Sequence, residues 1–160
     1  MAAIDLIKEW DSDGVTWLEK EQASRLLGEL GLALNPSTRR AGIELRIALE
    51  LDPIFGPVVA FSYGRMAMDV WDDVTYRVVP LTTKDARVMV REPKAAGRLL
   101  GGYGSAKAPD VSGIEAAILK LSQLAEAAPE LVELALDPVY AYPDGLVVKA
   151  ATIRLAGAKP

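Results

Sequence analysis

The chain has 160 residues, of which 51% are hydrophobic and 25% are charged, and its formal net charge at pH 7 is -4. This composition is typical of one soluble globular domain, and the acidic balance argues against general nucleic-acid binding, which needs a basic face. The absence of Cys and His excludes disulfides, thiolate or imidazole metal ligands, and a phosphohistidine relay within the chain. No apolar run is long enough for a membrane span and no cationic leader is present, so we expect a cytoplasmic protein without membrane partners.

The N-terminal part is predicted to be helical. The apolar spacing predicts a first helix over Ala2–Trp10. Thr16 and Glu19 have the spacing of a capping box, which predicts a second helix that begins there and ends near Gly31. Residues 34–40 contain several breakers and little periodicity, so we expect a connector.

Strand patterns dominate the rest of the chain. Residues 43–51 alternate between apolar and polar side chains, which is typical of a strand with one buried face. Further strands are predicted at 57–63, 66–71, 74–79, 131–142 and 146–155, and further helices after Thr82, after Pro93 and after Asp110. The predicted fold class is α+β, an antiparallel or mixed sheet with helices packed on one face.

A group of acidic side chains is a candidate metal-binding site. Asp69 and Asp73 point to the same face if they lie on one strand, and Asp72 lies between them. Together with Glu133 and Asp137 they could offer the oxygen ligands that Mg²⁺ prefers. The alternative is an ordinary acidic turn between strands with the other carboxylates in solvent.

The order of several motifs points to a known family. Gly42-Ile43-Glu44-Leu45, followed by residues 52–59, is similar in order and spacing to the second half of the ATP-grasp region of NDP-forming acyl-CoA synthetases. The similarity continues through 72–81, 99–103 and 119–124 and ends at residues 153–155. The resemblance implies a lobe like the C-terminal lobe of an ATP-grasp domain.

The same resemblance divides the chain into regions. It implies an N-terminal helical segment and connector over residues 1–40, an ATP-grasp-like lobe over 41–156, and a tail over 157–160.

The resemblance also assigns site residues, none of them catalytic. It places Glu44 in the nucleotide cleft, and Arg65 beside the cleft where a second glycine is usual, so both are expected to face nucleotide. It places Asp69 and Asp137 at metal-binding positions where the family usually has glutamate and asparagine. Ala135 stands where the family usually has an acidic ligand. The implied cofactor is ATP or ADP with Mg²⁺, bound weakly or not at all.

A larger departure lies near Thr38 to Ala41, where the family has a further stretch that supplies the phosphate-binding lysine and the relay histidine. We therefore expect a truncated, degenerate domain that binds nucleotide weakly or mediates an interaction, without ligase activity of its own. One alternative is an ATP-binding subunit of an ADP-forming acyl-CoA ligase that a complementary partner chain completes. Another is a self-associating structural or regulatory module.

Overall fold

The computed structural model describes residues 1–64, 73–101 and 107–157. The strands are β1 (Ala33–Leu34), β2 (Ile43–Asp52), β3 (Gly56–Ser62), β4 (Val74–Val78), β5 (Leu131–Tyr142), β6 (Gly145–Val148) and β7 (Ala151–Leu155). The helices are α1 (Ala2–Ser12), α2 (Lys20–Glu29), α4 (Thr83–Arg91), α5 (Ala96–Leu99) and α6 (Val111–Ala127). The strand predicted at 66–71 lies outside the described residues.

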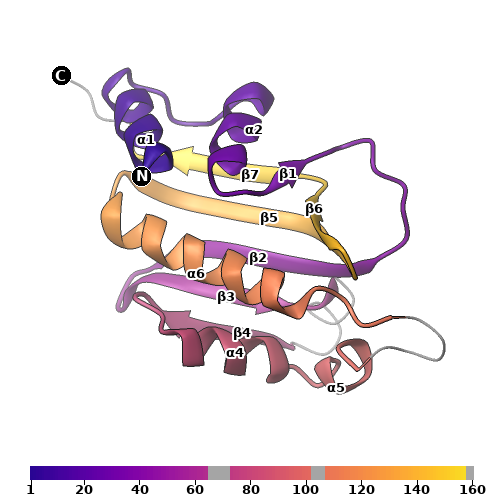
Figure 1. Cartoon of the computed structure of the whole chain (residues 1–160). Coiled ribbons are helices and arrows are strands. Elements are labelled where there is room, and N and C mark those ends of the chain that lie inside the picture. The colour runs from indigo at the N-terminus through magenta and orange to yellow at the C-terminus, as the bar shows by residue number, and fades with distance from the viewer. Residues whose placement is uncertain (65–72, 102–106, 158–160) are drawn as a thin grey trace.

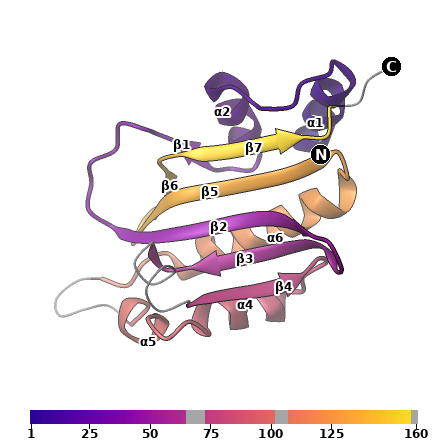
Figure 2. The ribbon, with the colours of Figure 1, turned by 180° about the vertical axis from the view of Figure 1, so that it is seen from behind.

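The strands form a seven-stranded mixed sheet in the order β1-β6-β5-β2-β3-β4, and β7 also pairs with β5. The pairs are antiparallel apart from β1 with β6, which is parallel. Figure 1 shows α4 and α6 in front of the sheet, and in Figure 2 the strands are seen from behind without a helix in front of them. The predicted α+β class with helices on one face is confirmed.

The core lies between this sheet and its helices. The alternation of β2 buries Leu45, Ile47 and Leu49 on the helix-covered side. They join a single core cluster with Ile114 and Ile118 of α6, which are one helical turn apart. Each such side chain contributes roughly 1.5–3 kcal/mol by leaving water. The core therefore fixes which face of the sheet remains open.

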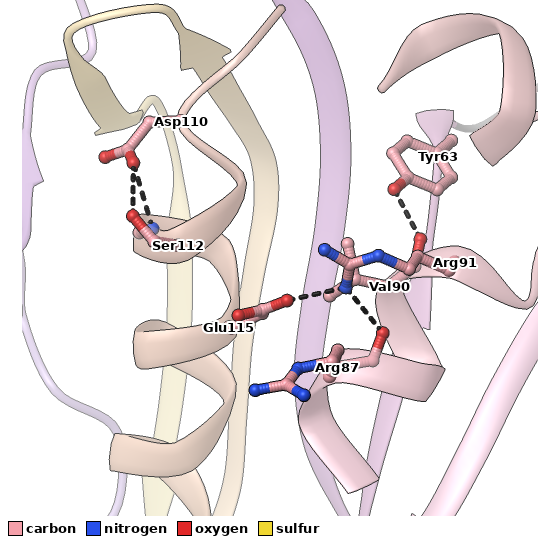
Figure 3. Close-up of polar contacts among 8 residues, drawn as sticks. Tyr63, Arg87, Val90, Arg91, Asp110, Ser112 and Glu115 are labelled. Atoms are coloured by element: carbon pink, nitrogen blue, oxygen red, sulfur yellow. Dashed lines mark hydrogen bonds and ion pairs between the residues drawn. The ribbon is translucent and has the colours of Figure 1, made fainter. Parts of the chain in front are cut away.

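Specific polar contacts tie α4 to the sheet and to α6. Thr82 accepts a hydrogen bond from the Asp85 amide at 3.1 Å, and Asp85 accepts one from the Thr82 amide at 2.7 Å, which is the predicted helix start. The Tyr63 hydroxyl donates to the Val90 carbonyl at 2.6 Å near the end of α4, and the Arg91 guanidinium reaches Glu115 on α6 at 2.6 Å (Figure 3).

The predicted start of the second helix is wrong. The helix begins at Lys20, with Glu19 and Gln22 forming the capping box in place of Thr16 and Glu19. Residues 16–18 are instead extended along β7, where the Leu18 amide donates to the Ile153 carbonyl and the Leu155 amide to the Thr16 carbonyl. The unpaired edge of β7 offers this segment backbone partners, and that long-range pairing outweighs the local capping signal.

The single strand predicted at 146–155 is two strands, β6 and β7, on the same side of β5. The break lies opposite a shift in the β5 register, where Pro138 has no amide hydrogen to continue the ladder. The Asp137 amide donates to the Ala150 carbonyl at 3.0 Å and the Lys149 amide to the Pro138 carbonyl at 2.9 Å. These two bonds join β5 to the residues between β6 and β7. The Asp137 amide is therefore bonded at the break and not within a regular strand ladder.

Candidate functional site

The open face is the side of the sheet opposite the helices, and strand register places its side chains. Ala48 lies between Ala60 of β3 and Ala135 of β5. Arg46 is opposite Ser62, and Glu50 is opposite Val58. Small side chains therefore form the middle of this face, and charged side chains flank them.

Arg46 is the centre of the polar contacts on the open face. Its Nε atom lies 3.6 Å from Oδ2 of Asp137, and both of its terminal nitrogens lie 3.4 Å from Oε1 of Glu50. The Arg46 and Asp137 side chains are 21% and 22% exposed. Water screens the attraction between such half-buried charges less than the attraction between fully exposed ones.

The structure locates two of the four residues that the sequence assigned to the site. Glu44 is exposed on the open face, opposite Tyr140 of β5, and Asp137 is half-buried on the same face beside Arg46. Arg65 and Asp69 lie outside the described residues. The assignment of nucleotide to Glu44 and Arg65, and of metal to Asp69 and Asp137, remains a prediction.

The side chains that the structure describes do not fit a divalent metal at Asp137. Within residues 1–64, 73–101 and 107–157, no group of three or more His, Cys, Asp or Glu side chains is arranged to hold a metal ion. The methyl group of Ala135 supplies no oxygen, and the cation beside Asp137 is an arginine. Hard cations need several oxygen ligands at short distance.

Ser62 is the unusual polar residue of this face. It is 1% exposed, and its hydroxyl has no hydrogen-bond partner among the described residues. Leaving a buried hydroxyl without a partner costs stability.

The β4-edge patch is an exposed apolar surface at one border of the open face, made of Leu51, Ile54, Phe55, Tyr76 and Val78. Ile54 is 83% exposed and Phe55 is 64% exposed. Most of the patch borders a groove of about 360 Å³, which Glu50 and Arg77 also line. Leu51, which the alternation would bury, is exposed near the end of β2, where it is opposite Pro57. Clustered apolar exposure of this kind is a common feature of surfaces that contact another molecule.

The connector over residues 35–42 runs from β1 at one border of the sheet to β2 in its middle (Figure 1). The Tyr142 hydroxyl donates to the Arg40 carbonyl at 2.9 Å, and the Arg40 guanidinium lies 4.1 Å from the centre of the Tyr142 ring. Arg40 also pairs with Asp144 at 3.1 Å. At Gly42, a Cβ atom would come within 2.6 Å of the Tyr142 ring. These contacts anchor the end of the connector next to β2, whereas most of its residues are exposed.

Sequence reasoning missed both Arg46 and Tyr142. The period of two along β2 placed Arg46 on the same face as Glu44, so a search along that face could have found it. No local signal pointed to Tyr142, because its partner Arg40 lies 102 positions away.

The geometry defines an α+β lobe with one open sheet face, and the chain matches a known protein family. Residues 18–155 match the family described as ATP-grasp domain. The chain belongs to the ATP-grasp family. Among the described residues, no helix is long and apolar enough to cross a lipid bilayer.

Two similar proteins are acetate–CoA ligases or their subunits. An acetate–CoA ligase (ADP-forming) I from Archaeoglobus fulgidus is 37% identical over 107 residues, which are 67% of this chain and 16% of that protein. The beta subunit of acetate–CoA ligase (ADP-forming) I from Pyrococcus furiosus is 35% identical over 114 residues, 71% of this chain and 49% of that subunit. The chain therefore spans half or less of the length of these relatives.

A solved structure extends the likeness to nearly the whole fold. Acetyl-coenzyme A synthetase 1 from Ca. Korarchaeum cryptofilum in its apo form has a TM-score of 0.83 at 25% identity, covering 96% of this chain and 99% of that one. Its complex with coenzyme A, Ca-AMPCP and HgCl+ has a TM-score of 0.68 at 38% identity, covering 72% of this chain and 50% of that one.

Proposed function

We propose that this chain is a reduced ATP-grasp lobe that binds adenine nucleotide weakly at most, acts through an interaction, and has no ligase activity alone. The observation that carries the proposal is the connector over residues 35–42. It passes directly from β1 to β2 and packs against Tyr142. This is the point at which the family resemblance implies a further lobe.

The chemistry of nucleotide ligases explains why the lack of a further lobe at this point would prevent catalysis. Such enzymes stabilise the charge that develops on the phosphates with cations and dipoles held around it. One sheet face leaves much of a triphosphate in water, where these interactions are weak. The chain also has no His to carry a phosphoryl group.

Calorimetric titration of the full chain with ATP, with and without Mg²⁺, tests the proposal together with an assay for ATP- and coenzyme-A-dependent thioester formation. We expect a dissociation constant weaker than roughly 1 mM and no thioester. Micromolar binding of ATP, or thioester formation by the chain alone, would contradict the proposal.

A second candidate function is that of an ATP-binding subunit completed by a complementary ligase subunit. The β4-edge patch favours it, because an exposed apolar surface of this kind suits a partner. A relative of similar sequence is itself named a subunit beta. The expected partner is therefore an acyl-CoA ligase subunit that carries the coenzyme-A site.

Mixing the purified chain with such a subunit and measuring complex formation by light scattering tests this candidate. Phe55→Ser should abolish the complex, whereas Val88→Ser, which changes an exposed apolar side chain on α4, should leave it intact. If the unmixed chain is already a dimer that Phe55→Ser dissociates, the surface serves self-association instead. A monomer that forms no complex removes the candidate.

A further inference from the structure

We propose that Arg46 excludes divalent cations from Asp137 and itself supplies the positive charge of the open face. The inference rests on the proposed function in one respect: it assumes that an anionic ligand binds to the open face. Its consequence is that any phosphate-bearing ligand binds here without the help of Mg²⁺.

The contacts of Arg46 are the first argument. Its guanidinium reaches Asp137 on the neighbouring strand and Glu50 on its own strand, at 3.6 and 3.4 Å. A divalent ion at Asp137 would need to approach the carboxylate to about 2.0–2.6 Å. It would then lie a few ångströms from a guanidinium that stays charged at every physiological pH, so the two cations would repel each other.

The position of Arg46 is the second argument. β2 has β3 on one side and β5 on the other, so its backbone is held by ladders at both borders. The Arg46 side chain is only 21% exposed, and moving it from Asp137 would leave that carboxylate and Glu50 without this cation. Separating half-buried opposite charges costs more than separating exposed ones.

The neighbours of Asp137 are the third argument. Ala48 and Ala135 lie side by side on the same face and contribute only methyl groups. Glu133 pairs with Arg154 at 3.5 Å, so this carboxylate also has an arginine as its cation. Arginine therefore neutralises the carboxylates on either side of Ala135.

A guanidinium can also take over part of the role of a metal towards an anion. It carries five N–H donors in one plane, a geometry that matches phosphate oxygens. Its hydrogen bonds to Glu50 come from Nη1 and Nη2, each of which carries a second hydrogen. A phosphate could therefore accept from Arg46 while the arginine keeps its carboxylate partners.

The test uses Mn²⁺ alone as the probe, with bound Mn²⁺ measured by electron paramagnetic resonance on the full chain. We expect the unchanged protein and Asp137→Asn to bind Mn²⁺ equally weakly. Arg46→Met should bind Mn²⁺ about 10-fold more tightly or better, and Arg46→Met combined with Asp137→Asn should lose that gain. Arg46→Lys, which keeps the charge, should behave like the unchanged protein.

Two results would overturn the proposal. One is Mn²⁺ binding by the unchanged protein that Asp137→Asn abolishes, and the other is no gain in Arg46→Met when circular dichroism shows it folded. If Arg46→Met does not fold, Arg46→Gln takes its place, and the absence of a gain in Mn²⁺ binding by that folded variant would overturn the proposal. No nucleotide is needed, so failure of ATP binding would bear on the proposed function and leave the Mn²⁺ result unaffected.

Discussion

The hydroxyl of Tyr142 donates a hydrogen bond to the backbone carbonyl of Arg40 at 2.9 Å and so joins the β5–β6 hairpin to the connector before β2. The Arg40 guanidinium lies over the same ring, 4.1 Å from its centre. These contacts stabilise the direct passage from β1 to β2. The end of the connector next to β2 is therefore held by interactions with the β5–β6 hairpin.

Tyr142→Phe should lower the free energy of unfolding by about 0.5–1.5 kcal/mol, because the Arg40 carbonyl loses its donor while the ring remains in place. Urea denaturation followed by circular dichroism measures the change. Tyr140→Phe is the matched control, since its hydroxyl makes no hydrogen bond with the described residues, and it should change little. Equal effects of the two substitutions would show that the Arg40 bond contributes nothing specific.

Gly42→Ala and Gly28→Ala should have opposite effects. A Cβ atom at Gly42 would come within 2.6 Å of the Tyr142 ring, which should cost about 1–3 kcal/mol. Gly28 lies in α2 with nothing within 4 Å of an added Cβ, so alanine there should stabilise by about 0.5–1 kcal/mol. Thermal unfolding compares the variants. Gly42→Ala should cost much less in a Tyr142→Ala background, and an unchanged cost would refute the steric explanation.

Ser62→Ala and Ser122→Ala test whether a buried hydroxyl needs a partner. The Ser122 hydroxyl accepts a hydrogen bond from the Leu81 amide at 2.8 Å, so its loss should cost about 1–3 kcal/mol. The Ser62 hydroxyl has no partner among the described residues, so its removal should be neutral or stabilise by up to about 1 kcal/mol. Chemical denaturation of both variants checks the difference. A large loss in Ser62→Ala would mean that this hydroxyl has a stabilising role.

Asp85 should make part of the free energy of unfolding depend on pH. The Thr82 backbone amide and then the Thr82 hydroxyl hold the pKa of Asp85 below its ordinary value. A carboxyl with a lowered folded-state pKa stabilises the fold above its unfolded pKa, near 3.9, and loses that contribution as pH falls through the lowered value. Asp85→Ala should therefore be less stable at pH 7, and its difference from the unchanged protein should shrink as pH falls from about 4 to 2.

Asp13→Ala is the control for this prediction, because Asp13 is exposed and its side chain makes no hydrogen bond or ion pair with the described residues. Its loss of stability at pH 7 should be smaller than that of Asp85→Ala. A constant difference for Asp85→Ala would show that the Thr82 contacts do not favour the charged carboxylate.

Much of the fold was predictable because its elements carry strong local patterns. The alternation of residues 43–51 identified β2, and the Thr82 capping box identified the start of α4. The errors arose where distant partners decide. Residues 16–18 pair with β7 instead of capping a helix, and the break in the last predicted strand lies opposite the register shift between β2 and β5 near Pro138.

The amino-acid sequence was sufficient to determine the class of fold, the family and the lack of a histidine within this chain. Each of these depends on residue types and their spacing alone. The folded chain decided that Asp137 faces Arg46 and that Tyr142 holds the connector. Both contacts join segments that are distant in sequence, and the register of β2 against β5 brings Arg46 and Asp137 together. That register results from packing the whole sheet against its helices, because a shift of one residue would expose the buried face of β2.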